Sequence, residues 1–539
     1  MTNTTVAIVG GGPNGLMALK NFREDGFDAT LFESRSWVGG LWKHSTDESI
    51  SSAATTIFNS SKYRASISDF PMTEEMDDFP TAAQLQKYFE RYCGHFGLWP
   101  HIKLGSPIKG VSRERDDWAV EVGSNEGSET RIEHFDKVVF ACGTFVKPRM
   151  PEIAGIEKFA AEAVHSMHFR EPSRYKGKNV LVVGLHSSAQ DAVTGLAPYA
   201  SRIYLSHRSG VVLIPRYAAD GSVYDRQPPL GTFIALLYLQ HLLPSVFQWI
   251  FDTFIGKISA AAFPSIPKAW NFSPAPSLAV AAPVVADELY PHLKSGLCEP
   301  VDGIARITGP RSLELKSGRM LTDIDAIVFC TGYNSLIPVP LSPSSVNPFP
   351  SLGAPPVLYR NIFSLHPDPS IRNNIAFLCQ AGAPLPGFAM FEFQAIAVSQ
   401  VWRGKSSLPP LKEMERWNRD YMTWRERIAK KYGIKSTFYS AFVPMADFFR
   451  WEDQCAGVGL KKRFGLVERW TTKEAWGLWW NDRQLWDLCM AGLCSPAIFR
   501  LFDDGKRKTW AGARSQILKD NKSAARQQRE RKRAMAKEE

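Results

Sequence analysis

Cysteine is scarce in this chain of 539 residues, and the few cysteines present form no pattern. The eight include no Cys-x-x-Cys pair, so neither a disulfide framework nor a dithiol redox centre is indicated. Free thiols, together with a first strand that begins almost at the N-terminus without a leader, favour a cytoplasmic protein. The eleven histidines show no spacing typical of metal ligands, and we predict no metal site.

Excess charge is nearly absent outside the C-terminal end. The net charge is +10, and residues 506–539 contribute +8 of it, with twelve Lys and Arg against four acids. The last part of this basic end, the tail at 520–539, lacks interleaved aromatic residues, so we expect no nucleic-acid partner. We predict that the tail, 520–539, is a solvated helix or disordered, and an anionic membrane surface is the partner that it fits better.

Long uncharged runs are also rare. Residues 232–251 contain no Asp, Glu, Lys or Arg and are numerous enough to span a membrane. Gln240, His241 and Gln248 dilute the run, and Pro244 would interrupt a single helix. Two buried helices fit it best, with an interfacial patch that makes peripheral membrane contact, or a true span, as alternatives.

What the sequence does contain is two glycine-rich turns, each between a strand and a helix. The first consists of Gly10, Gly11, Gly12, Pro13, Asn14 and Gly15. It follows an apolar strand at 5–9 and precedes a helix predicted over 15–25, so the helix N-terminus can face a pyrophosphate. Glu33 ends the next strand, 29–33, where an acid can bind an adenosine ribose. This unit is predicted to bind a dinucleotide.

The second turn follows a strand at 178–183 and is less regular. We assign to it Gly184, Ser187, Ser188, Ala189, Gln190 and Asp191. His186 stands where the second glycine is expected, and its Cβ should push a pyrophosphate outward. The following strand ends at Ser206, and Arg208 just beyond it can pair with a 2′-phosphate, which indicates NADPH. A plain surface arginine is the alternative.

Two dinucleotides face to face are the arrangement that passes a hydride from a nicotinamide to a flavin. Similar strands at 137–144 and 324–333, each ending in a glycine turn, indicate a duplicated fold. We therefore predict an α/β chain with two Rossmann-like dinucleotide-binding domains, the second inserted in the first, and a helical C-terminal extension. The predicted parts are residues 1–170 with 333–405 for FAD, 171–332 for NADPH with an apolar insertion at 218–290, a Trp-rich helical cap at 406–519, and the basic tail.

A series of short motifs runs in order along residues 5–400. They are Gly39-Gly40-Leu41-Trp42, Asn-Ser-Ser-Lys at 59–62, Ser-Asp-Phe-Pro at 68–71, the segment 159–170 around His165, Cys-Thr-Gly-Tyr at 330–333, and Glu-Phe-Gln-Ala at 392–395. Each alone is weak, but the series resembles the flavin-containing monooxygenases. In the segment 159–170, Ala161 replaces a glycine of the family pattern.

The resemblance implies an FAD-dependent enzyme that consumes NADPH and O2. It would form a flavin C4a-hydroperoxide and oxygenate nitrogen or sulfur in a small organic substrate, or carry out a related hydroxylation. Asn59 would be the catalytic residue, between flavin and nicotinamide, with a simple turn residue as the alternative. The resemblance adds these cofactor-binding residues: Gly40, Leu41, Trp42, Phe58, Asn59, His165, Thr331, Gly332 and Gln394. For His165, a structural hydrogen bond is the better explanation.

Three alternatives have specific motivations. Baeyer–Villiger oxygenation of a ketone is a close variant, although Phe169-Arg170 stands where such enzymes carry Trp-Pro. A flavoprotein with a decayed nicotinamide site would explain His186 and Ala161. A flavin disulfide reductase is the third alternative, but such an enzyme requires a redox-active cysteine pair, and this chain has none near either glycine turn. The sequence leaves the substrate and the oligomeric state open.

Overall fold

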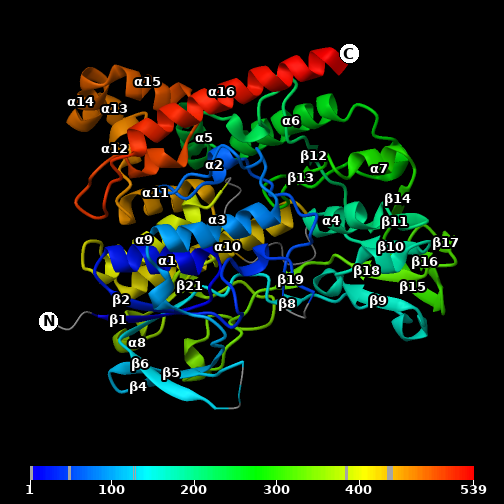
Figure 1. Cartoon of the computed structure of the whole chain (residues 1–539), viewed down its shortest axis with the longest axis horizontal. Helices are drawn as coiled ribbons and strands as arrows, with labels where there is room; N and C mark the ends of the chain where they lie inside the picture. Colours follow the sequence, from blue (N-terminus) through cyan, green and yellow to red (C-terminus); the bar gives the residue numbers. More distant parts are fainter. Residues whose placement is uncertain are drawn as a thin grey trace.

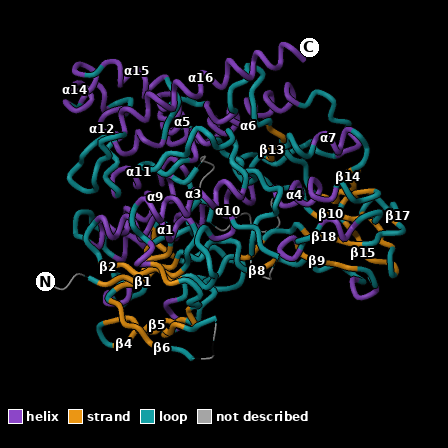
Figure 2. The backbone as a smooth tube through the Cα atoms, viewed as in Figure 1, coloured by secondary structure: helices purple, strands orange, loops and turns teal. Residues whose placement is uncertain are grey.

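The computed structural model contains two α/β units, with a layer of C-terminal helices along one side (Figure 1). It describes residues 4–538 except 47–49, 126, 128, 383–386 and 434–440. Strands gather in two separate places, one around β1 (Thr5–Val9) and one around β10 (Asn179–Val183), as Figure 2 shows. Both central strands are the apolar segments that precede the two glycine turns.

The larger sheet is built from segments far apart in the sequence. Its centre, β1, pairs in parallel with β2 (Asp28–Phe32) and β7 (Lys137–Phe140). On one side the sheet continues beyond β2 with β3 (Ile102–Lys103). On the other side it continues beyond β7 with β23 (Ile375–Phe377), β22 (Phe363–Ser364) and β21 (Leu358–Tyr359). The chain therefore returns to its first sheet after building the second, as predicted. A smaller sheet nearby contains β20 (Leu341–Ser342), β4 (Ile108–Glu114), β5 (Asp117–Val122) and β6 (Arg131–Phe135).

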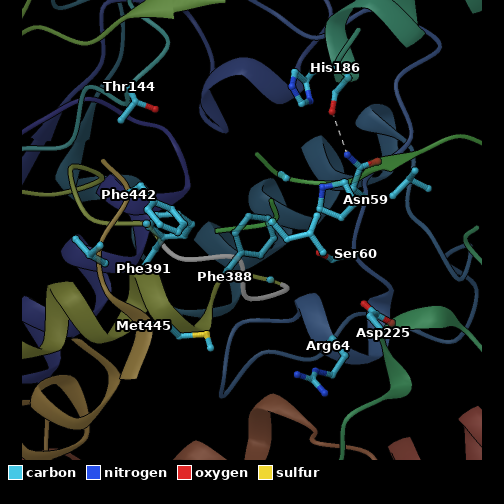
Figure 3. A pocket seen from close by; sticks show the side chains of 18 of the residues that line it. Asn59, Ser60, Arg64, Thr144, His186, Asp225, Phe388, Phe391, Phe442 and Met445 are labelled. Carbon is cyan, nitrogen blue, oxygen red and sulfur yellow. Dashed lines mark hydrogen bonds between the residues drawn. The ribbon is translucent and has the colours of Figure 1, made fainter. Parts of the chain in front are cut away.

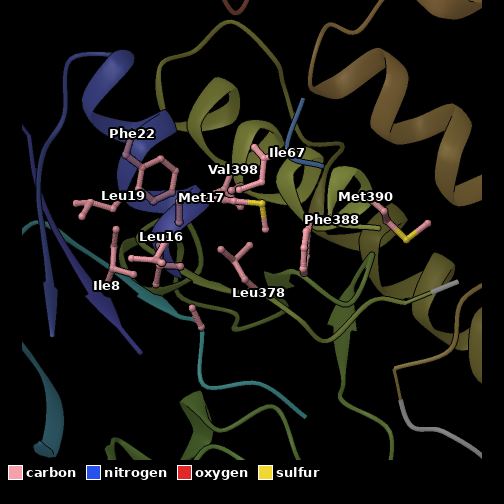
Figure 4. Packing of buried hydrophobic residues seen from close by; sticks show 14 of the residues in the cluster. Ile8, Leu16, Met17, Leu19, Phe22, Ile67, Leu378, Phe388, Met390 and Val398 are labelled. Atoms are coloured by element: carbon pink, nitrogen blue, oxygen red, sulfur yellow. The ribbon is translucent and has the colours of Figure 1, made fainter. Parts of the chain in front are cut away.

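Helix α1 (Pro13–Glu24) connects β1 to β2 and begins two residues before the predicted start. Pro13 favours this start, because a helix leaves the first N–H groups unpaired and proline lacks one. The helix packs between the sheet and α9 (Ala389–Trp402), where Leu16, Phe22 and Val398 are fully buried (Figure 4). Burial of each such side chain stabilises the fold by roughly 1.5–3 kcal/mol, so packing against the sheet and α9 fixes the position of α1 and of the glycine turn at its N-terminus.

The second sheet repeats this arrangement with β10 at its interior. Its order is β14 (Cys298–Asp302), β11 (Arg202–His207), β10, β18 (Ala326–Phe329) and β9 (Glu162–His165), all parallel. Helix α4 (Ser187–Leu196) follows β10. Strand β9 pairs with β18, although residues 162–165 fall in the range that the sequence assigned to the first domain. We therefore propose a boundary before residue 162.

The uncharged run forms two helices, α5 (Leu230–Leu242) and α6 (Pro244–Ala262), which are separated at Pro244 as predicted. Their burial is only partial. Phe233 and Phe247 are buried, whereas Leu242 and Trp249 are 69% and 68% exposed. Among the described residues, no helix combines the length and apolar character that crossing a membrane requires.

Helices dominate the C-terminal part, as predicted. They are α10 (Leu411–Lys431), α11 (Met445–Cys455), α12 (Leu460–Phe464), α13 (Glu468–Thr471), α14 (Lys473–Asn481), α15 (Arg483–Ala491) and α16 (Ala513–Glu538). A buried residue at the end of the short helix η9 (Pro496–Arg500) joins this part to the first unit. Arg500 donates to Glu392 of α9 (Nη2–Oε1 2.6 Å) and to Ser68 (Nε–Oγ 2.8 Å). Two of the short sequence motifs are thus held together by the cap.

The basic tail is a helix that lies against the body of the protein. In α16, Ile517 and Ala524 are buried, and Arg526 forms an ion pair with Glu74 (2.9 Å). The guanidinium of Arg531 stacks 3.3 Å above the ring of Tyr217. Of the two predicted states, helix and disorder, the helix is confirmed, and one of its faces packs.

The remaining strands and α-helices are mostly short, except α3 (Ala82–His95), whose Leu85, Phe89 and Tyr92 are fully buried in the core of the first unit. The others are β8 (Lys147–Pro148), β12 (Leu213–Ile214), β13 (Val284–Val285), β15 (Ile304–Gly309), β16 (Ser312–Leu315), β17 (Met320–Leu321), β19 (Tyr333–Asn334), α2 (Lys62–Ala65), α7 (Tyr290–Lys294) and α8 (Pro369–Arg372). Helix α2 begins three residues after Asn59 and positions the wall of the cavity described next.

Candidate active site

A cavity of about 2430 Å³ extends from the two glycine turns to the helices α5, α6 and α10. Its wall at the turns is polar backbone, and its far wall is apolar, with Phe388, Phe391, Phe442 and Met445 facing the same space (Figure 3). The predicted residues that line it are Gly10, Gly12, Pro13, Asn14, Glu33, Gly40, Leu41, Trp42, Phe58, Asn59 and Ser187. Both turns therefore contribute to one cavity.

The first turn has the shape of a dinucleotide cradle. Gly10 has φ +111°, and a Cβ there would lie 2.8 Å from the carbonyl oxygen of Ala141. A Cβ on Gly15 would lie 1.9 Å from the carbonyl oxygen of Gly10, so only glycine fits this close packing of helix on strand. At Gly12, in contrast, the nearest atom to a Cβ is 3.7 Å away, which leaves the backbone open toward the cavity. A pyrophosphate at the N-terminus of α1 fits this arrangement.

Glu33 is buried directly behind this turn. Its Oε2 accepts a hydrogen bond from the Gly11 N–H (2.6 Å), and its Oε1 accepts one from the Arg35 N–H (2.9 Å). These bonds hold the carboxylate in one orientation at the end of β2. The acid thus borders the cavity beside the turn, as the sequence predicted for a ribose ligand.

The second turn reproduces the backbone of the first. Gly184 has φ +130°, and a Cβ there would lie 2.3 Å from the carbonyl oxygen of Cys330. His186 has φ −95° and ψ −170°, close to the −71° and 177° of Gly12. Histidine therefore adopts this conformation without strain. Desolvation lowers the pKa of His186, so its imidazole at the cavity wall is neutral at neutral pH.

Asn59 connects the first unit with the second turn. Its side-chain Nδ2 donates to the Oγ of Ser187 in α4 (3.3 Å), the contact drawn in Figure 3. Its carbonyl oxygen accepts a hydrogen bond from the Tyr224 hydroxyl (2.8 Å). The amide is thus held at the point where the first unit meets the N-terminus of α4.

Further hydrogen bonds connect the units beside Asn59. Thr56 donates to Asp191 (2.7 Å), whose pKa burial raises to about 6. Arg216 binds both carboxylate oxygens of Glu288 (2.9 and 3.0 Å) and donates to the carbonyl oxygen of Phe58 (3.0 Å). The Gln190 amide also donates to Glu288 (2.8 Å). Asp191, predicted as a cofactor contact, is therefore engaged in joining the units, whereas Gln190 bonds within the second unit, to the carboxylate that holds Arg216.

Sequence reasoning missed Arg216 and Glu288. They are 72 positions apart, Arg216 just before the apolar insertion at 218–290 and Glu288 near its end, so no local spacing marked them. Thr56, three residues before Asn59, carried no signal of its own.

The remaining predicted residues lie outside the lining of the cavity. They are Gly11, Gly15, His165, Gly184, Ser188, Ala189, Gln190, Asp191, Ser206, Arg208, Thr331, Gly332 and Gln394. Some bond within the protein: His165 Nε2 donates to the Gly332 carbonyl (3.0 Å), and Gln394 to the Ala381 carbonyl (2.9 Å). Burial lowers the pKa of His165, and the Met167 N–H donates to its Nδ1 (3.1 Å), which fits a structural role. Arg208 is exposed at the end of β11, where a ligand could reach it.

Known proteins resemble the chain over its whole length. Residues 3–538 match the family described as flavin-binding monooxygenase-like. Monooxygenase aurF of Gibberella zeae is 35% identical over 97% of this chain and 98% of that protein. Flavin-containing monooxygenase 3 of Oryctolagus cuniculus is 28% identical, over 95% and 91%.

Solved structures share the fold. S-allyl-L-cysteine S-oxygenase from Allium sativum superposes with a TM-score of 0.61 at 19% identity, over 97% of this chain and 99% of that one. Cyclohexanone monooxygenase gives 0.60 at 15% identity, over 85% and 98%. The predicted architecture of two dinucleotide-binding domains and a helical C-terminal region is thereby confirmed. The chain belongs to the flavin-binding monooxygenase-like family and is a monooxygenase that uses FAD and NADPH.

Proposed function

We propose that this enzyme oxygenates a small organic substrate at nitrogen or sulfur, or by a related hydroxylation, within the cavity beside Asn59. The hydrogen bond from Asn59 to Ser187 carries the proposal, because it brings a residue of the first unit to the start of the second nucleotide turn. FAD, once reduced by NADPH, supplies the oxygen activation, for which we propose the flavin C4a-hydroperoxide as the oxygenating species.

The residues of the first turn would hold FAD. The N-terminus of α1 and the open backbone at Gly12 would face the pyrophosphate, and Glu33 would bind the ribose. An aromatic group next to Asn59 would exclude water: Phe58 stacks on Phe388 at 5.4 Å, and Trp42 meets Phe58 edge-on at 5.0 Å. Exclusion of water protects reactive intermediates from wasteful breakdown.

The second turn would hold NADPH. Ser187 and Ser188 begin α4, where a pyrophosphate can accept from the first N–H groups, and Arg208 would pair with the 2′-phosphate. Membership of a family that uses NADPH weighs against a decayed nicotinamide site. So does the backbone at His186, which matches that at Gly12.

The test is stopped-flow spectroscopy followed by product analysis. Purified protein loaded with FAD is reduced by NADPH without oxygen, mixed with isotopically labelled O2, and then given an aryl methyl sulfide. We expect loss of the flavin absorbance with NADPH, a lasting new band after oxygen, and one labelled oxygen in a sulfoxide. Flavin that NADPH cannot reduce would refute the proposal. A ketone probe that yields an ester would instead indicate Baeyer–Villiger oxygenation.

A further inference from the structure

Two charged side chains lie in the cavity wall close to Asn59, and no sequence motif pointed to them. Arg64 belongs to α2, and Asp225 belongs to the short helix η6 (Tyr224–Arg226). Both line the cavity, and both are labelled in Figure 3 on the same side of it as Ser60. They are only 8% and 3% exposed.

Arg64 is a buried cation with little compensation. Its Nη1 donates to the carbonyl oxygen of Pro228 at 3.3 Å, and no carboxylate of the described chain lies within 4.0 Å of its guanidinium. A guanidinium carries five N–H donors, and burying one without a partner is unfavourable. The unused donors of Arg64 therefore favour a ligand that supplies acceptor atoms.

Asp225 is also incompletely satisfied. Its Oδ2 accepts a hydrogen bond from the Ser61 N–H (2.8 Å), whereas its Oδ1 is enclosed and has no hydrogen-bond partner. Burial raises the pKa of Asp225, against the opposing effect of Ser61 and Arg64. A carboxyl group with a raised pKa can be protonated, and it then becomes a hydrogen-bond donor next to Arg64.

The surrounding wall is apolar. Phe388, Phe391 and Met445 face the same space in Figure 3. A polar pair within such a wall fixes the orientation of a molecule whose other contacts are non-directional.

We propose that Arg64 and Asp225 bind an oxygen acceptor of the substrate, a carboxylate or a carbonyl group, and so orient an otherwise apolar molecule beside Asn59. This inference rests on the proposed function, since it assigns the substrate to that cavity. Arg64 supplies the charge and most of the donors, and Asp225 adds a donor or fixes the bound group from the other side. Both are specificity-determining residues, and they take no part in bond breaking.

The test measures binding of three matched probes to the FAD-loaded protein, without NADPH, by equilibrium dialysis. Each probe is a naphthyl methyl sulfide that carries, at the same ring position, a carboxylate, an acetyl group or a methyl group. We expect one of the oxygen-bearing probes to bind at least about tenfold more tightly than the methyl probe, as hydrogen bonds to a charged group imply. The carboxylate and acetyl arms distinguish an anionic from a neutral acceptor.

The variants are Arg64→Met, Arg64→Lys and Asp225→Asn. Arg64→Met should bring the three dissociation constants to within about twofold of one another, and Arg64→Lys should keep a preference for the carboxylate. Asp225→Asn keeps the shape and the acceptor for Ser61, and it should reduce the preference without removing it. Arg427→Met is the control, since Arg427 lines the same cavity but is exposed.

Two results would overturn the inference. One is Arg64→Met with the same probe preference as the wild type. The other is an Arg64→Met variant that loses affinity equally for all three probes and has an altered flavin spectrum, which would mean that Arg64 contacts the cofactor. Because the binding measurement involves no turnover, it is independent of the stopped-flow test. Selective probe binding by a protein whose flavin NADPH cannot reduce would refute the proposed function and leave the binding site standing.

Discussion

Replacing Arg500 by methionine tests whether the cap and the first unit are held together by buried charge. Arg500 is 1% exposed, and Glu392, its partner at 2.6 Å, is 0% exposed. Its Nη2 also donates to Asn21 of α1 (2.9 Å) and lies 3.2 Å from Asp69. Methionine has a similar length but no charge. The variant therefore leaves the buried Glu392 carboxylate with the Ser68 N–H as a donor (3.1 Å) but without its ion-pair partner.

Removing one partner of a buried ion pair costs about 3–5 kcal/mol. We therefore expect Arg500→Met to lower the free energy of unfolding by that order, measured by denaturant titration monitored through tryptophan fluorescence. The tryptophan-rich cap should separate from α1 first, and FAD should be released at a lower denaturant concentration than in the wild type.

The effect has a defined pH dependence. Burial would raise the pKa of Asp69, but Arg500 and Lys20 outweigh it and hold this pKa below its usual value. A carboxyl group whose pKa is lower in the folded protein than in the unfolded chain stabilises the fold at pH values above its unfolded pKa, about 3.9. This stabilisation is lost as pH falls through the pKa of the folded protein. The difference between wild type and variant should thus be largest above about pH 5 and should shrink as pH falls below about 4, where Asp69 takes up a proton.

Two further variants make the experiment decisive. Arg514→Met removes an exposed arginine that pairs with Asp482, and it should leave the unfolding midpoint unchanged. Combining Arg500→Met with Glu392→Gln should recover part of the loss, because the unpaired charge disappears. If Arg500→Met proved as stable as Arg514→Met, the buried cluster would have no role in holding the cap.

Four more outcomes are expected. Gly12→Asp should fold, since a Cβ there meets only Gly40 at 3.7 Å, but its carboxylate should prevent FAD binding; purified variant with full yellow colour would contradict this. Arg208→Ala should raise the KM for NADPH by about tenfold and leave that for NADH unchanged, whereas equal effects would mean that Arg208 does not bind the 2′-phosphate. Asn59→Leu should continue to consume NADPH while hydrogen peroxide replaces product, and an unchanged product-to-NADPH ratio would exclude its proposed role. Burial raises the pKa of Asp191 to about 6, so the wild type should lose stability relative to Asp191→Asn as pH rises from about 4 through 6; parallel unfolding curves would show that the carboxyl is not buried in solution.

The parts of the fold that were predictable are those encoded by neighbouring residues. The turn from Gly10 to Gly15 specifies its own geometry, because a positive φ and a close helix contact each require glycine locally. The apolar strands before both turns and the break at Pro244 are local signals of the same kind.

The contacts that join distant segments were not predictable. Arg500 meets Ser68 across 432 positions, and Arg216 meets Phe58 across 158. Neither arginine stands in a distinctive pattern, since their partners are defined only after the sheets and helices have assembled. The start of α1 was predicted two residues too late, because turn chemistry decides such limits.

The hydrogen bonds between the units also set how freely the nicotinamide nucleotide can exchange. Four of them involve residues 56–59 of the first unit: Asn59 to Ser187, Thr56 to Asp191, Arg216 to the carbonyl of Phe58, and Tyr224 to the carbonyl of Asn59. At a net value of about 1 kcal/mol each, parting the units costs about 4 kcal/mol. Only on the order of one molecule in a thousand is then open at any moment. If entry requires that parting, the rate of nucleotide exchange is limited by rare openings, and weakening any one of these bonds accelerates it.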